Sequence, residues 1–203
     1  AFQPDRFLAG HLWKPLTYQF IHGGLMHLCM NMLWLFFFGP DVERALGSRS
    51  FFRFYLLCGA LGVLACLIPY FLPGYALRSP SIVGASGAVM GVMIAFAVID
   101  PERQFTLFPF PIQINARALV VIVVVINLLN AIASARSGGS DVSVATHFGG
   151  MGVGFAYMKL KPGFTRWTRA RQQQRTESKA PPDLDRVGKA VDNIFKFKDR
   201  DDQ

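Results

Sequence analysis

Hydrophobic residues fall into long blocks along this chain, separated by short polar connections. The blocks cover residues 25–38, 51–72, 82–99, 118–135 and 142–160. A helix that crosses a bilayer needs about 20 mainly apolar residues, a length that block 51–72 reaches easily. The other blocks are marginal or reach it only by including Gly, Ser, His or Asn, and such helices usually face protein or water rather than lipid. The pattern therefore predicts an all-α membrane protein built as a helical bundle.

The polar connections indicate where the predicted helices end. Residues 39–44 have the composition of a turn, in which Gly39 closes a helix and Pro40 follows it. Residues 105–114 contain two prolines, which favours a surface connection. The N-terminal segment is too polar to span a bilayer but rich in aromatic residues, so we expect it at the membrane interface, with short helices. The predicted division is an interfacial segment at 1–24, a transmembrane core at 25–160 and a basic tail at 161–203.

Composition and charge agree with a membrane protein. Hydrophobic residues make up 52% of the 203 residues, charged residues 17%, and the net charge is +8. The tail is expected to be mobile apart from a short amphipathic helix over residues 184–197. Basic residues gather just after the last block, at Lys159, Lys161, Arg166, Arg169, Arg171 and Arg175.

The position of these basic residues predicts a cytoplasmic C-terminus under the positive-inside rule. Contact with anionic lipid and simple solvation of the tail are both open interpretations. Nucleic-acid binding is not expected, because the basic residues are not interleaved with exposed aromatic ones. The three cysteines lie in apolar blocks without metal-ligand spacing, which predicts buried thiols rather than disulfides at Cys29, Cys58 and Cys66.

Ser86 lies among small residues in the stretch Gly84-Ala85-Ser86-Gly87, near the start of the third block. One interpretation is a small polar residue that lets two membrane helices pack closely. The other is a nucleophile at a helix start, with glycines that leave space for a substrate backbone. The stretch alone favours the packing interpretation, because a G-x-S-G string has little specificity.

The last block supplies a partner that changes this balance. Two helix faces share the spacing i, i+3 and i+7, which are Gly84, Gly87 and Gly91 in the third block and His147, Gly150 and Gly154 in the last. Glycine faces let helix backbones approach closely. If the two faces meet, Ser86 and His147 come within hydrogen-bond reach, and His is the usual base that activates a serine. No Asp or Glu lies in the middle of a block, so we expect a Ser–His dyad without an acidic third member.

His27 and Asn31 lie four residues apart and share one face of a predicted helix. Both donate hydrogen bonds, and both need partners in apolar surroundings. They either hold helices together or, with backbone N–H groups at the start of the Ser86 helix, stabilise an oxyanion. A metal site formed by His22, His27 and His147 is disfavoured, because no carboxylate or Cys joins them at a typical spacing.

As an ordered set, these motifs resemble those of the rhomboid family of intramembrane serine proteases. Each motif alone is weak, but the set is very specific and covers most of residues 13–154. The matching features are Trp13-Lys14, His22 with His27-x-x-x-Asn31, Gly39 with Glu43-Arg44, Gly84-x-Ser86-Gly87-x-x-x-Gly91, and Ala145-x-His147-x-x-Gly150-x-x-x-Gly154.

The resemblance implies a bundle of six membrane helices, with an active site below the outer surface and open to water. It implies Ser86 as the nucleophile, His147 as the general base, and an oxyanion hole formed by His27, Asn31 and the Ser86 amide. The implied substrates are single-spanning membrane proteins in the lipid bilayer, cut in or near their transmembrane segment, and no metal or organic cofactor is implied. The family's first transmembrane helix is expected to be absent from this chain. The sequence does not indicate an oligomeric state.

Two residues depart from the family's pattern. Lys14 stands where Arg is usual, which keeps the charge but loses the fork geometry. Met90 stands where many members place an aromatic residue against the catalytic His, so the orientation of that His is expected to be looser. Short loops favour a prokaryotic-type member, so the expected location is the prokaryotic plasma (inner) membrane, with the C-terminus inside and Ser86 towards the outer side.

Two other function classes stay open. A rhomboid-like pseudoprotease would bind membrane clients without cutting them, but inactive relatives typically lack the Ser–His pair. A transporter or channel would show internal repeats or intramembrane charges, and the sequence has neither.

Overall fold

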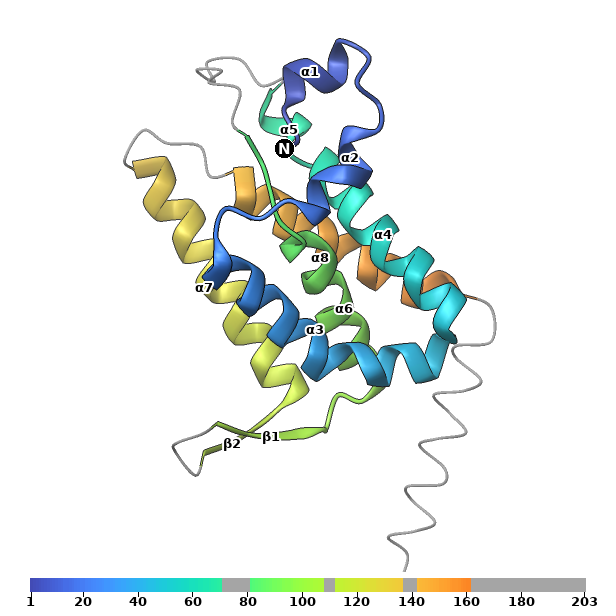
Figure 1. Cartoon of the computed structure of the whole chain (residues 1–203). Coiled ribbons are helices and arrows are strands. Elements are labelled where there is room, and N and C mark those ends of the chain that lie inside the picture. The colour runs from blue at the N-terminus through green and yellow to red at the C-terminus, as the bar shows by residue number, and fades with distance from the viewer. Residues whose placement is uncertain (71–80, 108–111, 137–141, 162–203) are drawn as a thin grey trace, which may run out of the picture. The chain divides into compact units, whose positions relative to one another are not determined.

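The computed structural model describes residues 1–70, 81–107, 112–136 and 142–161. Within these ranges the chain is a helical bundle with one small hairpin (Figure 1). The tail from residue 162 onward, with the helix expected at 184–197, lies outside the described residues. The elements are α1 (Pro4–Leu8), α2 (Lys14–Thr17), the 3-10 helix η1 (Tyr18–Phe20), α3 (Leu25–Leu46), α4 (Ser48–Leu64), α5 (Leu67–Tyr70), α6 (Ser86–Ile99), β1 (Gln104–Leu107), β2 (Ile112–Asn115), α7 (Ala116–Arg136) and α8 (Val142–Leu160).

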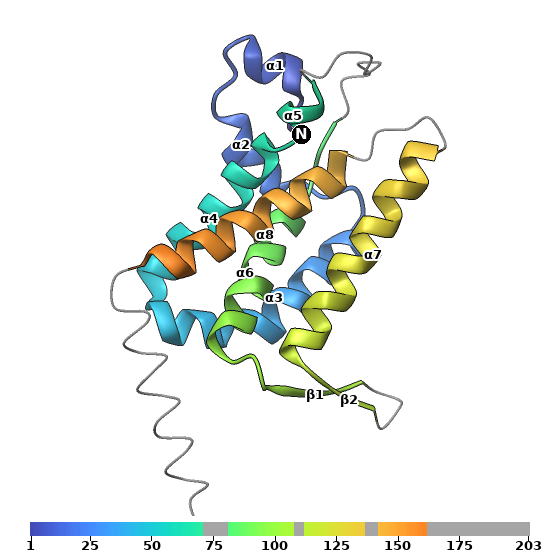
Figure 2. The same ribbon diagram turned by 180° about the vertical axis from the view of Figure 1, so that it is seen from behind.

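Helix α6 is the central element, lying inside the bundle in both ribbon views (Figures 1 and 2). It packs against α3, α4 and α8. Most of its side chains are buried, as expected for a helix that is apolar on every side. At 14 residues it is also much shorter than α3 or α7.

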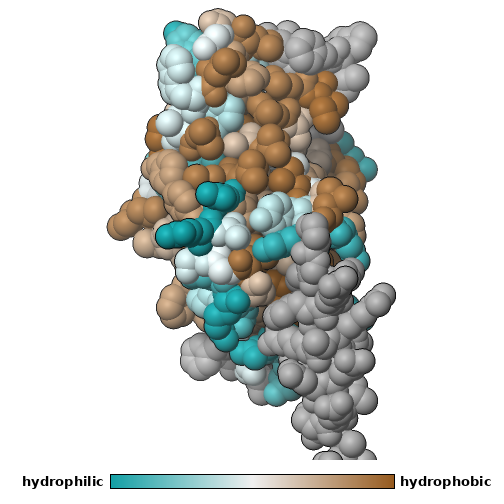
Figure 3. Space-filling view, turned by 90° about the vertical axis from the view of Figure 1, so that its right-hand side faces the viewer, coloured by the Kyte–Doolittle hydropathy of each residue, from teal (hydrophilic) through white to brown (hydrophobic). Residues whose placement is uncertain are grey.

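The outer surface of the bundle is apolar. Two helices, α3 and the stretch 116–134 of α7, are long and apolar enough to cross a membrane. Many of their large side chains are exposed, including Leu25, Phe36, Val121 and Leu129. Figure 3 shows hydrophobic residues over the upper part of one face and hydrophilic residues gathered lower down. Such a surface suits a lipid environment.

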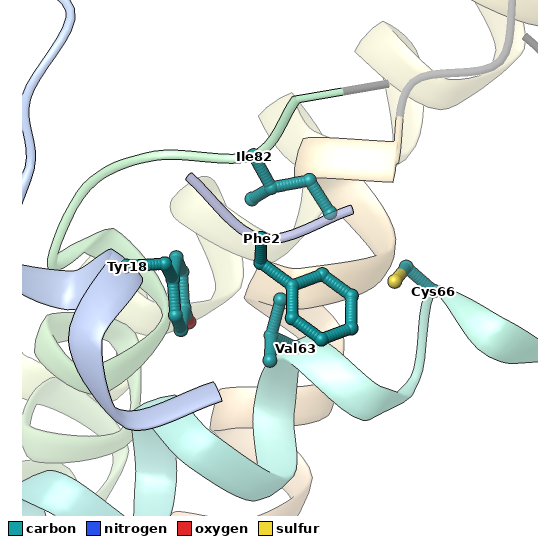
Figure 4. Packing of buried hydrophobic residues seen from close by; sticks show 5 residues of the cluster. All are labelled: Phe2, Tyr18, Val63, Cys66 and Ile82. Atoms are coloured by element: carbon teal, nitrogen blue, oxygen red, sulfur yellow. The ribbon is translucent and has the colours of Figure 1, made fainter. Parts of the chain in front are cut away.

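The N-terminal segment contains the expected short helices, but it also packs on the core. Phe2 exchanges two backbone hydrogen bonds of 2.8 Å with Ile82, just before α6. Its ring packs among Tyr18, Val63, Cys66 and Ile82 (Figure 4). The Tyr18 hydroxyl donates to the Gly59 carbonyl of α4 at 2.9 Å. These contacts tie residues 1–24 to α4 and to the approach of α6, while other aromatic residues of the segment stay exposed.

The turn predicted at residues 39–44 is wrong, because α3 continues to Leu46. Pro40 lacks an N–H and its ring crowds the preceding turn, which kinks a helix without necessarily ending it. Figure 1 shows α3 changing direction along its length. Beyond Pro40, Arg44 donates to the Pro40 carbonyl at 3.2 Å and pairs with Asp41 at 2.9 Å. The helix ends at Leu46 and is capped by Gly47, whose φ of 81° suits glycine.

Two further expectations differ from the structure. Block 51–72 does not form one long helix: α4 starts at Ser48 and ends at Leu64, where bonds from residue i to i−3 tighten the chain before α5. The connection expected at 105–114 contains the antiparallel pair β1–β2, with Phe105 packed on Phe38 and Phe96. Among the three free cysteines, Cys29 is exposed, because its side of α3 faces outward.

Candidate active site

Ser86 is the first residue of α6 and is half-buried. Gly84, two residues earlier, has a φ of 110°, a conformation that favours glycine. A Cβ at Gly84 would lie 2.7 Å from His27 Nε2. The His27 ring therefore occupies the space where a side chain would stand, close to the start of α6. Glycine at this position serves both the backbone turn and the approach of His27.

His147 lies on α8, with its Nε2 atom 2.8 Å from Ser86 Oγ. The two residues are 61 positions apart in the sequence, and both side chains are half-buried. The structure thus brings together the two residues that the spacing argument paired. A serine hydroxyl at this distance from an imidazole nitrogen can transfer its proton to that nitrogen.

Close contact between helix backbones makes this approach possible. A Cβ added at Gly150 would fall on the Gly87 carbonyl, and one at Gly154 would lie 2.5 Å from the Gly91 carbonyl oxygen. The two glycine faces of α6 and α8 therefore meet directly. Sequence reasoning missed that α4 joins them: a Cβ at Gly62 would lie 2.7 Å from the Gly150 nitrogen. The signal was present, since Gly62 and Gly59 break the apolar run of α4.

His27 and Asn31 both lie on α3 beside Gly84. His27 Nδ1 accepts a long hydrogen bond of 3.5 Å from the Gly23 N–H, which puts the ring proton on Nε2, the atom near Gly84. Asn31 is 5% exposed, and its amide donates to the His27 carbonyl at 2.9 Å. Its Nδ2 atom would be 3.8 Å from a Cβ at Gly84. Both donors lie near the start of α6, although the Asn31 amide is bonded to its own helix.

His22 anchors the residue before Ser86. Its Nε2 atom accepts a hydrogen bond from the Ala85 N–H at 3.4 Å. Burial and the neighbouring His27 lower the pKa of His22, which favours the neutral ring that such acceptance needs. A cavity of about 750 Å³, mostly apolar, opens beside His22 and Ala85 between α3 and α4. Among the described residues, no group of three His, Cys, Asp or Glu side chains could hold a metal ion.

Asn127 of α7 is the site residue that sequence reasoning missed. Its Oδ1 atom lies 2.7 Å from His147 Nδ1, on the side of the ring away from Ser86. The side chain is only 6% exposed. The available signal was an amide in the middle of a helix of Val, Ile and Leu, because polar residues at such positions are costly and usually have a function.

Together, an apolar outer surface, a short central helix and a half-buried Ser–His pair define a polytopic helical membrane protein. Comparison with known proteins adds the family: the Rhomboid domain matches residues 9–162. The chain belongs to the rhomboid family and is an integral membrane protein with the family's helical-bundle fold.

Several curated relatives are similar over most of this chain. It is 36% identical over 138 residues to "Rhomboid protein 1, mitochondrial" of Saccharomyces cerevisiae, covering 68% of this chain and 38% of the relative. It is 30% identical over 173 residues to "RHOMBOID-like protein 12, mitochondrial" of Arabidopsis thaliana, covering 78% and 49%. It is 32% identical over 148 residues to "Rhomboid protease GluP" of Bacillus subtilis, covering 72% and 25%.

The chain thus spans half or less of the length of each of these relatives. Two of these relatives are named as mitochondrial proteins, and the third is from Bacillus subtilis. The expected prokaryotic plasma membrane is therefore unsupported by these similarities, while membership of a membrane-protein family that includes proteases is shown.

Proposed function

We propose that this chain is an intramembrane serine endopeptidase that cleaves transmembrane segments of membrane proteins through a Ser86–His147 dyad. The observation that carries the proposal is the 2.8 Å separation of Ser86 Oγ and His147 Nε2 at the start of α6. Relatives whose names call them rhomboid proteases support the same reaction class. A pseudoprotease would have no need for this pairing.

In the proposed reaction, Ser86 Oγ attacks the carbonyl carbon of the scissile peptide bond while His147 Nε2 takes its proton. The peptide C–N bond then breaks, and His147 returns the proton to the leaving amine. Water then attacks the acyl-enzyme while His147 Nε2 takes its proton, the ester bond to Ser86 Oγ breaks, and His147 returns the proton to Oγ as the carboxylic acid leaves. No cofactor is needed to balance these steps.

The oxyanion of the tetrahedral intermediate needs preorganised donors. The Ser86 N–H is free of intrahelical bonding at a helix start, and His27 Nε2–H lies nearby. Asn31 becomes a third donor when its amide turns from the His27 carbonyl towards the start of α6. We assign His27, Asn31 and the Ser86 amide to the oxyanion hole on this basis.

The length of α6 supports a site inside the membrane. Its 14 residues give a helix about 21 Å long, less than the roughly 30 Å of a bilayer core. If the C-terminal end of α6 lies at one membrane–water interface, its Ser86 end lies inside the bilayer core, short of the opposite interface. Peptide bonds within or near a membrane-spanning segment, such as those of single-spanning proteins, are the ones within reach.

The orientation follows from the basic residues. Most basic residues of the described chain lie at helix ends remote from Ser86. They are Arg44, Arg49, Arg53, Arg103, Arg117, Lys159 and Lys161. Under the positive-inside rule these ends face the cytoplasmic side and Ser86 the outer side. A topology reporter fused after Gln203 is expected to report the inner side. Activity of a fused reporter that works only on the outer side would overturn this orientation.

Replacing Asn31 with Ala is expected to lower kcat by about ten- to a thousand-fold, because one oxyanion donor is lost. KM should change little, since the donor acts mainly on the transition state. Cleavage rates of a reconstituted transmembrane substrate measure both parameters. Cys29→Ala, an exposed position on the same helix, is the matched control. Kinetics of Asn31→Ala equal to those of the control would remove Asn31 from this role.

Reaction with a fluorophosphonate, followed by mass spectrometry, tests the function itself. The expected results are a single adduct on Ser86 of the full chain in lipid vesicles and cleavage of a single-spanning substrate in the same vesicles. The pseudoprotease alternative predicts binding of the substrate with neither adduct nor product. That result in folded protein would exclude the protease proposal.

A further inference from the structure

Helix α7 is apolar on its outer side and carries one buried amide. Ile126 and Leu128 are 51% and 50% exposed, whereas Asn127 between them is 6% exposed. Burial of an amide in a membrane helix is costly unless its donors and acceptors are paired. Asn127 pairs on both sides of its amide, and one partner is His147 of the proposed dyad.

The orientation of this amide is set by its own helix. Asn127 Nδ2 donates to the Val123 carbonyl at 2.8 Å, which can only accept. The amide oxygen therefore points the other way, to His147 Nδ1 at 2.7 Å. A reversed amide would set two oxygen lone pairs against each other at Val123.

An amide oxygen accepts but does not donate, so His147 Nδ1 must carry the ring proton. In the neutral ring the other nitrogen, Nε2, then has a free lone pair. That atom faces Ser86 Oγ at 2.8 Å. The contact with Asn127 thus selects the tautomer in which His147 can accept the serine proton, and it fixes the plane of the ring.

We propose that Asn127 is the positioning residue of the site: it holds His147 in the base-competent tautomer and orientation without adding a charge. The inference rests on the proposed protease function and deepens it. A neutral amide suits this place, because an ionised carboxylate in a membrane helix is expensive. The third member of the site is then a neutral amide, which agrees with the expected absence of an acidic one.

Kinetics of three variants of the full chain in lipid vesicles test the proposal. Asn127→Leu, similar in size without an acceptor, is expected to lower kcat by about ten- to a hundredfold with KM nearly unchanged. Asn127→Asp keeps an acceptor oxygen for His147 but lacks the N–H that Asn127 donates to the Val123 carbonyl, so it should recover part of the lost rate. Asn130→Leu, an exposed position one turn along α7, is the matched control and should match the wild type. If Asn127→Leu fails to fold, Asn127→Ala takes its place.

The histidine tautomer provides a readout that does not depend on turnover. The chain has 4 histidines, so ¹⁵N-histidine NMR spectra can be assigned with His147→Gln. We expect His147 protonated at Nδ1 in the wild type and in Asn127→Asp, and a mixture of tautomers in Asn127→Leu. A structural role in packing alone would leave the tautomer unchanged.

The outcomes separate the two proposals. If the wild type cleaves and Asn127→Leu cleaves equally, or if His147 keeps one tautomer in Asn127→Leu, the positioning role is wrong while the protease function stands. If the folded wild type neither cleaves nor reacts with fluorophosphonate, the protease function fails, and a role for Asn127 in catalysis fails with it. A selective loss of kcat together with the tautomer mixture supports the inference.

Discussion

Replacing Ser86 with Ala is expected to reduce cleavage of a transmembrane substrate by about 10⁴- to 10⁶-fold and to abolish fluorophosphonate labelling. Alanine keeps the helix start and the backbone N–H but removes the oxygen that forms the acyl-enzyme. The fold should persist, because Ser86 is half-buried and alanine is smaller. Ser81→Ala is the matched control and should retain activity, because Ser81 is an exposed serine five residues before Ser86.

His147→Ala is expected to reduce cleavage by a similar factor, because the Ser86 hydroxyl then loses its base. The double variant should be no worse than either single one, since the two residues act as one unit. Rates are measured with equal amounts of folded protein in vesicles. Substantial cleavage by either single variant would contradict the dyad, and strictly additive losses would mean that the two residues act separately.

Gly150→Ala is expected to destabilise the bundle by about 1–3 kcal/mol, a common range for overpacked cores. The new Cβ would fall on the Gly87 carbonyl, and this neighbour is backbone that cannot rotate away. Helices α6 and α8 must then move apart. Because Ser86 and His147 lie on these two helices, a shift of about 1 Å should also cost about a hundredfold in kcat.

Gly152→Ala on the same helix is the matched control. Nothing lies within 4 Å of a Cβ built there. The higher helix propensity of alanine should stabilise this variant by about 0.5–1 kcal/mol. Thermal unfolding in detergent and turnover in vesicles measure the two effects. Equal stability of the Gly150→Ala and Gly152→Ala proteins would contradict direct contact of the glycine faces.

Much of the helical architecture was predictable from hydrophobic blocks. The block at 142–160 matches α8, and the block at 118–135 matches the body of α7. These helices are bounded by polar or charged residues, so composition reports their ends. The family assignment was also within reach, because the motifs recur in a fixed order over most of the chain.

Composition did not predict the helix ends and strand pairing that depend on three-dimensional contacts. Pro40 was interpreted as following a helix end, but a proline kinks a helix without necessarily ending it, and α3 continues to Leu46. Nothing in the apolar residues around Leu64 marks the point where α4 tightens and stops. The pair β1–β2 lies where two prolines favoured an irregular connection, and its Phe105 packs on Phe38 of α3, a contact that a local pattern does not report.

The candidate site was predictable only as far as spacing reached. The i, i+3, i+7 glycine faces indicated that Ser86 and His147 approach each other, and their separation in the structure is 2.8 Å. The contact of Asn127 with His147 depends on the rotation of α7 about its axis. A helix that is apolar nearly all round leaves that rotation undetermined by sequence. The catalytic roles of Ser86 and His147 and the positioning role of Asn127 stay predictions.

The wide separation of the paired residues along the chain has a consequence for biosynthesis. Ser86 and His147 are 61 positions apart, and α8 is the last helix in the described chain. Contacts between such distant positions form late, because loop closure must precede them. While the chain emerges from the ribosome, α6 is complete long before α8 arrives to pack against it. In the proposed mechanism, the nascent chain therefore cannot cleave other membrane proteins until α8 has packed against α6.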